Sequence, residues 1–168
     1  MSLRLIANWK LNGSREFNHQ WALEFFRNFI GQNFSYLGIA PASLYIDHLK
    51  GVIADHGIKI GAQNIDLVET GPRTGEISAS MIKDLGCEFS IIGHSERRIL
   101  FHETNQIICH KLIQANNNFV VPILCVGESM QEKQDNTTFK VIEQQIIGAL
   151  KDASELSAII IAYEPVWA

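Results

Sequence analysis

Three side chains with acid–base chemistry follow short apolar runs that are typical of β-strands. The run ending at Tyr163 delivers a carboxylate, Glu164, and the run ending at Gly93 delivers an imidazole, His94. The first apolar run of the chain is followed by an ammonium group, Lys10. A carboxylate can abstract a proton, an imidazole can polarise an oxygen, and an ammonium can attract an anion. This combination indicates proton transfer next to a carbonyl group.

Further polar residues follow the same runs or their neighbours: Asn8, Gln63, Asn64, Glu96, Cys125 and Glu128. Taken singly, these residues and the three named above have ordinary structural interpretations. Lys10 and Glu96 would be solvated surface charges, and His94 would be a turn residue. Cys125 would be a small apolar core residue, and Asn64 would cap a turn. The functional interpretation depends on the whole set lying at one end of successive strands.

Strand-like and helix-like segments alternate strictly along the sequence. The expected strands are Leu3–Ala7, Leu37–Ala40, Lys59–Gln63, Phe89–Gly93, Val120–Val126 and Ala158–Tyr163. The expected helices are Glu16–Phe29, Ser43–His56, Ser78–Leu85, Thr104–Asn116 and Thr138–Leu150. This alternation predicts βαβ units, a parallel sheet and one domain over residues 1–168. An open doubly wound sheet and a closed (β/α) barrel both fit the alternation.

The distribution of the polar residues favours the barrel. Adjacent strands lie about 4.8 Å apart, so the outer strands of an open six-stranded sheet are roughly 24 Å apart. Side chains at the two outer strands of such a sheet could share a small substrate only if the strand order brought them together. A barrel aims every strand end at one central mouth. The glycine motifs of open dinucleotide- or nucleotide-binding sheets, GxGxxG and GxxxxGK[ST], are also missing.

Composition and charge exclude several other classes. The net charge of −4 argues against nucleic-acid binding, and no apolar run reaches the roughly 20 residues of a membrane span. The three cysteines, Cys87, Cys109 and Cys125, are widely spaced and predict neither a disulfide framework nor a zinc site. His94 has no second histidine at metal-ligand spacing. We therefore expect a cytoplasmic protein without a metal site.

Six motifs carry a resemblance to a known family. "ANWKLNG", "GAQN", "TGE", "IIGHSERR", "LCVGE" and "AYEPVWA" resemble, in order and spacing, the triosephosphate isomerase family. The resemblance runs through all 168 residues. It implies a (β/α)8 barrel, here with six strands and five connecting helices, and interconversion of dihydroxyacetone phosphate and glyceraldehyde 3-phosphate. It implies no cofactor.

The resemblance also implies a role for each matched residue. Glu164 would be the base, His94 the neutral electrophile at the carbonyl oxygens, and Lys10 the positive charge near the oxyanion and phosphate. Asn8, Trp9 and Lys10 would form part of the substrate-binding segment, and Glu96 would be an acid beside the site. Cys125, Glu128 and Asn64 would support these groups from behind.

The segment from Gly71 to Glu76 resembles the family's interdigitating loop, which places Thr74 near a partner subunit's active site. The resemblance therefore implies a homodimer. Here Pro72 and Arg73 stand where the family usually has a small residue followed by an aromatic one. Exchange of an apolar contact for a guanidinium changes how this loop must pack.

The resemblance covers only six of the eight strands of a barrel that generally has about 250 residues. We therefore expect this sequence to be part of a longer polypeptide, whose remainder would carry strands seven and eight and the phosphate-binding backbone. The alternative is a complete 168-residue product that forms a partial barrel with two exposed strand edges. Such a product would be catalytically inactive and would act only as a binding or assembly piece.

Overall fold

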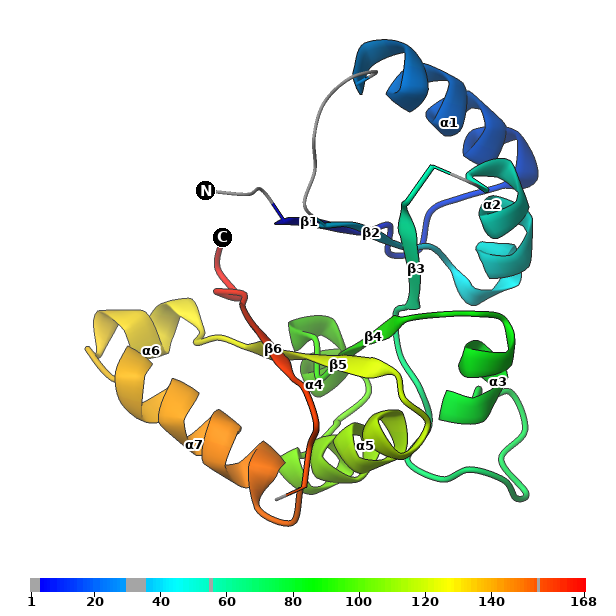
Figure 1. The fold of residues 1–168 in the computed structure, drawn as a ribbon. Helices are drawn as coiled ribbons and strands as arrows, with labels where there is room; N and C mark the ends of the chain where they lie inside the picture. The colour runs from blue at the N-terminus through cyan, green and yellow to red at the C-terminus, as the bar shows by residue number, and fades with distance from the viewer. Residues whose placement is uncertain (1–3, 30–35, 55, 154) are drawn as a thin grey trace.

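Six parallel strands form one curled sheet in the computed structural model, which describes residues 4–29, 36–54, 56–153 and 155–168. Each strand pairs with the next in the chain, in the order β1 to β6. Figure 1 shows the strands following an open curve rather than a flat layer. The fold is thus a curled part of a (β/α)8 barrel, as the sequence predicts. The strands are β1 (Arg4–Asn8), β2 (Tyr36–Ala40), β3 (Lys59–Ala62), β4 (Phe89–Ile92), β5 (Val121–Val126) and β6 (Ile160–Tyr163).

The crossover helices lie on the outer side of this curve (Figure 1). Their amphipathic patterns predict them well, except that the expected helix Ser43–His56 is a 3-10 turn followed by a shorter α-helix. Leu3 and position 55, which belong to the expected elements, lie outside the described residues. The crossover helices are α1 (Arg15–Phe29), η1 (Ser43–Tyr45), α2 (Ile46–Val52), α3 (Ala79–Asp84), α5 (Asn105–Asn117) and α7 (Thr138–Leu150).

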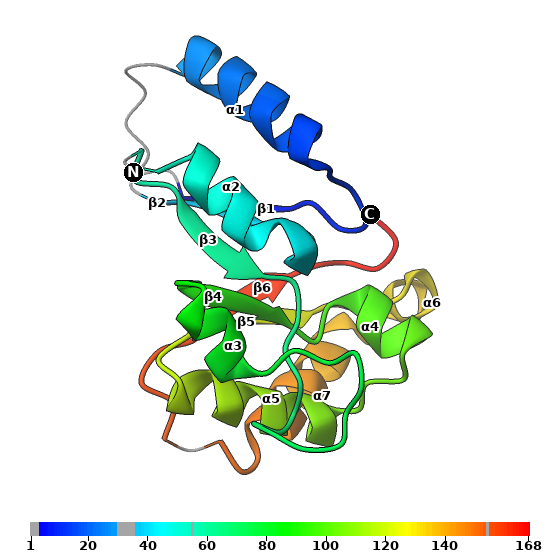
Figure 2. The same cartoon turned by 90° about the vertical axis from the view of Figure 1, so that its right-hand side faces the viewer.

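Two further helices, α4 (Ser95–Leu100) and α6 (Met130–Gln134), were not predicted. The connections from β4 to β5 and from β5 to β6 therefore hold two helices each, rather than one. Both helices are too short to show an apolar periodicity. For α6 a signal exists, because Ser129 and Glu132 form a complete capping box. Figure 2 shows both helices beside the carboxyl ends of the strands.

The inner face of the curve has its own small core, centred on the fully buried ring of Phe89. Two glycines on neighbouring strands make room for this ring. A Cβ added at Gly61 would lie 2.3 Å from the ring, and one added at Gly38 would lie 2.8 Å from it. The absence of a side chain at both positions therefore allows a bulky residue to fill the inside of the curve.

The larger core lies between the outer face of the sheet and the helices. Its centre consists of aliphatic side chains that are fully buried, including Ile39, Leu49, Ile92, Leu112 and Leu124. Burial of each such side chain stabilises the fold by roughly 1.5–3 kcal/mol before entropy costs.

The two outermost strands have a different environment. Along the described residues, β1 and β6 each pair with a single strand. Outer-face residues there remain accessible, as Leu5 is 45% and Ile161 is 44% exposed. The core is therefore concentrated between β2 and β5.

Replacement of Phe89 by alanine tests the importance of the inner core. We expect Phe89→Ala to lower the free energy of unfolding by about 3–5 kcal/mol, because the two glycines leave a cavity that neighbours cannot fill. Chemical denaturation followed by circular dichroism measures the change. The control is Phe139→Ala on α7, where the ring is 88% exposed and a change within about 0.5 kcal/mol is expected. Equal effects of the two changes would contradict this account of the core.

Candidate active site

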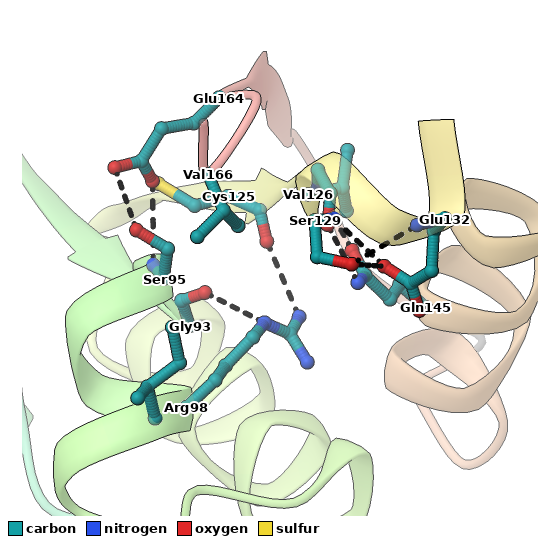
Figure 3. Close-up of a pocket in the computed structure, with 12 residues that line it drawn as sticks. Gly93, Ser95, Arg98, Cys125, Val126, Ser129, Glu132, Gln145, Glu164 and Val166 are labelled. Carbon is teal, nitrogen blue, oxygen red and sulfur yellow. Dashed lines mark hydrogen bonds between the residues drawn. The ribbon is translucent and has the colours of Figure 1, made fainter. Parts of the chain in front are cut away.

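The predicted acid and imidazole meet at the carboxyl ends of β4 and β6. The Nε2 atom of His94 lies 2.7 Å from Oε1 of Glu164. The hydroxyl group of Ser95 donates a hydrogen bond to the same oxygen at 2.9 Å, and its backbone N–H donates to Oε2 at 3.3 Å. Figure 3 shows the two bonds from Ser95. The first residues of α4 thus hold the carboxylate that β6 delivers.

The hydrogen bonds of His94 define which of its ring nitrogens carries a proton. The backbone N–H of Glu96 donates to Nδ1 at 3.2 Å, so His94 is the N-cap of α4 through its ring. Because Nδ1 accepts, Nε2 carries the proton that points to Glu164. The carboxylate of Glu96 also approaches Nδ1 at 3.5 Å, but the lone pair there is already occupied. The arrangement corresponds to an imidazole whose Nε2–H is a donor.

The pKa of Glu164 is below its ordinary value of 4.5. Partial burial alone would raise this pKa, but the hydrogen bond from His94, together with the two bonds from Ser95, outweighs it. Glu164 is therefore ionised at neutral pH. This interaction stabilises the fold above pH 4.5, and the stabilisation is lost as the pH falls through the lowered pKa.

Lys10 is held at the site by an unusual backbone conformation. Its φ of 52° lies in the left-handed region, which costs a residue with a side chain about 1 kcal/mol or more. Two side chains oppose this cost. The Asn8 amide oxygen accepts from the Lys10 N–H at 3.0 Å, and the Gln63 amide donates to the Lys10 carbonyl at 3.0 Å. Gln63 also donates to the Ala40 carbonyl, so it joins the ends of β2 and β3 to this turn.

The ammonium group of Lys10 pairs with the carboxylate of Glu96 at 2.9 Å. The hydrogen bond that Lys10 donates to Glu96 and the negative charges of Glu96 and Glu164 raise the pKa of Lys10, although partial burial opposes them. Because both partners are about half exposed, their pairing contributes only about 0–1 kcal/mol to stability. The main effect of the pairing is therefore to hold the positive charge of Lys10 in a fixed position near Glu164.

Cys125 and Glu128 lie at the end of β5, behind the acid. Cys125 is buried, and burial together with the nearby Glu164 charge raises the pKa of its thiol to about 12. Glu128 accepts hydrogen bonds from the Tyr163 hydroxyl at 3.0 Å and the Trp167 indole at 3.1 Å. Burial alone would raise the Glu128 pKa, but these bonds hold it below its ordinary value. Glu128 thus links β5 to the segments on both sides of Glu164.

Asn64 belongs to a largely buried polar network that reaches α4. Its side-chain oxygen accepts from Lys111 at 2.7 Å, and Lys111 also pairs with Glu103 at 2.6 Å. Arg97 of α4 donates to the same Glu103 oxygen. Through this network Asn64 supports α4, the helix whose N-cap is His94.

The side chain of Trp9 lies in an aromatic cluster rather than beside the acid. Its ring meets those of Phe17 and Trp21 at centroid distances of 5.0 and 5.3 Å. Its backbone N–H donates to Ala40, which joins the first loop to the end of β2. The structure thus gives the Trp9 ring the role of anchoring the loop that carries Lys10.

The loop residues Arg73 and Thr74 are both exposed. Arg73 donates to the buried carboxylate of Asp66 at 2.8 Å. Burial alone would raise the pKa of Asp66, but the bonds from Arg73 and the Val68 N–H hold it below the ordinary value. Arg73 therefore folds back onto its own chain, and Thr74 lies next to it at the tip of the loop.

A cavity of about 190 Å³ lies beside the carboxylate of Glu164, between α4, the end of β5 and α7 (Figure 3). Ser95, Arg98, Cys125 and Gln145 are among its lining residues. Along the described parts of the chain, no group of three or more His, Cys, Asp or Glu side chains could hold a metal ion. None of the described helices is long and apolar enough to cross a membrane.

One residue of this arrangement, Ser95, is not among the predicted site residues, and Gln63 is predicted only as a polar residue at a strand end, without a role. Ser95 follows His94 within "IIGHSERR", and its place as the first residue of α4 aims both its N–H and its hydroxyl at Glu164. Gln63 sits in "GAQN", but nothing in its type shows that it reaches across to the Lys10 carbonyl. Both contacts join segments far apart in sequence, which local patterns do not report.

The fold and the site together define the class of protein. The chain is part of a (β/α)8 barrel whose strand ends bring together a carboxylate, an imidazole and an ammonium group. Proteins of this architecture carry their active sites at this face.

The comparisons with known proteins identify the family. Residues 3–168 match the family model described as triosephosphate isomerase. The triosephosphate isomerase of Magnetococcus marinus is 39% identical, and the match covers 100% of this chain and 68% of that protein. The triosephosphate isomerase of Escherichia coli is 40% identical, and the match covers 98% of this chain and 65% of that protein. The crystal structure of triosephosphate isomerase from Bartonella henselae has a TM-score of 0.87 and 34% identity, and the match covers 100% of this chain and 70% of that one. The chain belongs to the triosephosphate isomerase family, and it spans about two thirds of the length of these curated relatives.

The hydroxyl group of Ser95 should lower the pKa of Glu164. We expect Ser95→Ala to raise the pKa of Glu164, because the carboxylate loses a hydrogen bond that favours its ionised form. Titration of the Glu164 carboxyl carbon by ¹³C NMR measures this pKa. The control is Ser129→Ala, which removes a hydroxyl that lines the same cavity but bonds to Glu132. A Glu164 titration that is unchanged in Ser95→Ala, or shifted equally by both changes, would contradict this role.

Proposed function

We propose that the protein catalyses the interconversion of dihydroxyacetone phosphate and glyceraldehyde 3-phosphate. The observation that carries the proposal is the contact of Glu164 with the Nε2–H of His94, close to the positive charge of Lys10. Relatives that bear the name triosephosphate isomerase support it, because they match the chain over nearly its full length. The substrate is therefore a small phosphorylated triose.

In the proposed reaction Glu164 removes a proton from the carbon next to the carbonyl group and returns it to the neighbouring carbon. The electron pair of the broken C–H bond forms an enediolate between the two steps. The Nε2–H of His94 gives its proton to the oxygen on which negative charge develops, and the ring then takes the proton of the neighbouring hydroxyl group, so that the carbonyl moves to the other carbon. Lys10 stabilises the developing charge electrostatically. Asn8 holds the Lys10 backbone, and Glu96 holds its ammonium group.

The hydrogen bonds of Glu164 imply a first step before chemistry. A carboxylate that accepts from both His94 and Ser95 is a weak base, because those bonds favour its ionised form. To reach a substrate carbon, Glu164 has to leave these donors. Its proton affinity then rises, and the Nε2–H of His94 becomes available for a substrate oxygen.

Replacement of the acid tests the proposed activity. In a coupled assay with glyceraldehyde 3-phosphate, we expect Glu164→Gln to lower kcat by about a thousandfold or more, with a smaller change in KM. A glutamine retains the shape of the side chain but cannot accept the proton. The control is Glu143→Gln on α7, an exposed position, which should leave both constants unchanged. Turnover that Glu164→Gln leaves intact, or no turnover by the unaltered protein, would overturn the proposal.

We further propose that the protein acts as a homodimer through the exposed loop at residues 71–76. Figure 1 shows the connection between β3 and α3 extending away from the sheet. The contact of Arg73 with Asp66 gives this loop a fixed shape in the single chain, which reduces the entropy lost when it binds. Thr74 is the residue that would reach the partner's site. A single domain over residues 1–168 and a cytoplasmic location remain predictions.

The dimer proposal depends on Arg73. We expect Arg73→Ala to weaken association by about tenfold or more, because the buried Asp66 carboxylate loses its charged partner and the loop loses its fixed shape. Sedimentation velocity over a concentration series measures the dissociation constant. Arg27→Ala, at an exposed position of α1, is the matched control and should not change it. A purely monomeric protein at high concentration would contradict the proposed dimer.

A further inference from the structure

The chain beyond the end of β5 runs beside the segment that carries Glu164. The backbone N–H of Glu164 donates to the Val126 carbonyl at 2.8 Å, and that of Val166 donates to the Glu128 carbonyl at 3.0 Å. These bonds continue the parallel ladder between β5 and β6 past the last residues of both strands. The position of the acid therefore depends on the path of residues 126–128.

On the other side, the backbone of β5 has no strand to pair with at this point. The last paired residues of β4 and β5 are Ile92 and Leu124, after which β4 ends. Backbone groups of Cys125 and Gly127 would remain without partners there. Because buried peptide groups need hydrogen bonds, their partners have to come from side chains.

Two side chains supply these hydrogen bonds. Arg98 of α4 donates to the Cys125 carbonyl at 3.2 Å. Gln145 of α7 then binds both sides of Gly127: its Oε1 accepts from the Gly127 N–H at 2.9 Å, and its Nε2 donates to the Gly127 carbonyl at 2.9 Å. Figure 3 shows Gln145 extending from its helix toward this end of β5. One amide side chain thus takes the place of a further strand residue at Gly127.

Gly127 in turn touches the backbone of the acid. A Cβ added at Gly127 would lie 1.8 Å from the Glu164 carbonyl oxygen and 2.5 Å from its carbonyl carbon. The two backbones are therefore as close as they can be, and only glycine permits this approach. A movement of the Gly127 peptide is transmitted directly to Glu164.

We propose that Gln145 is a positioning residue that fixes the catalytic carboxylate through Gly127. It lies on the opposite side of Gly127 from the acid and holds this residue by two hydrogen bonds. The effect on turnover rests on the proposed isomerase function, but the control of the Glu164 backbone does not. A misplacement of about 1 Å at a reacting group can lower a rate by about a hundredfold.

The test compares Gln145→Met with Gln144→Met. Methionine retains the length of the side chain and removes both hydrogen bonds, and Gln144 is an exposed neighbour on the same helix. We expect Gln145→Met to lower kcat by about ten- to a hundredfold with KM changed less than about threefold. Gln144→Met should leave both constants unchanged.

A second readout requires no turnover. Amide hydrogen exchange, followed by NMR, should be about tenfold or more faster at Gly127 and Glu164 in Gln145→Met than in Gln144→Met, because the clamp on the peptide is lost. Exchange in the central strand β4 should stay the same in both variants. This readout tests the inference even if the unaltered protein does not turn over the triose phosphate.

The outcomes separate clearly. Faster exchange with reduced kcat supports the inference, and faster exchange in a protein with no basal turnover supports the clamp while refuting the proposed function. Unchanged exchange and unchanged kcat in Gln145→Met would overturn the inference. If Gln145→Met does not fold, Gly127→Ala tests the same contact from the other side. It should reduce kcat by pushing on the Glu164 peptide, and full activity of that variant would also overturn the inference.

Discussion

The structure depends on one constraint, which is that the end of β6 must meet the start of α4. Only then can an ionised carboxylate be partly buried, because His94 and Ser95 supply the hydrogen bonds that compensate for lost water. A hydrogen bond to a charged group contributes about 1.5–3 kcal/mol, which is comparable to the cost of partial burial. The curl of the sheet, the short helix α4 and the turn after β1 are all arranged around this meeting point.

Support for this contact comes from two directions. On the side of α4, the buried network of Arg97, Glu103 and Lys111 holds the helix, and it reaches the end of β3 through Asn64. Burial lowers the pKa of Lys111, and its bond to Glu103 opposes this effect. Because the three residues are mutually dependent, removal of one would leave buried charge without a partner. The network therefore contributes more to the placement of α4 than to overall stability.

On the side of β6, support comes from backbone contacts rather than charge. The close approach of Gly127 to Glu164 and the clamp by Gln145 fix the acid along the strand. Glu128 joins Tyr163 to Trp167 across the acid, and Lys133 lies over the Trp167 ring at 3.2 Å. The acid thus sits between a rigid strand end and a segment held by polar side chains.

Much of the fold follows from the sequence, because parallel strands and amphipathic helices have distinct periodicities. The alternation of strands and helices predicts all six strands. Because the carboxyl ends of barrel strands meet at one mouth, it also predicts that His94 and Glu164 lie together. The short helices α4 and α6 are not predicted, since five or six residues give no periodic signal. The contacts of Ser95, Gln63 and Gln145 are not predicted for another reason. Each joins segments that are distant along the chain, and its residue type is compatible with many surface positions.

Deuterium exchange in heavy water tests the central claim. This claim is that Glu164 transfers a carbon-bound proton while His94 and Lys10 stabilise the charge that develops on the substrate oxygen. The protein is incubated with dihydroxyacetone phosphate in deuterium oxide, and the recovered triose phosphates are measured by proton NMR. The account predicts that deuterium enters at the carbon next to the carbonyl group and that Glu164→Gln abolishes its entry. Triose phosphates that interconvert without taking up deuterium, or uptake that persists in Glu164→Gln, would contradict it.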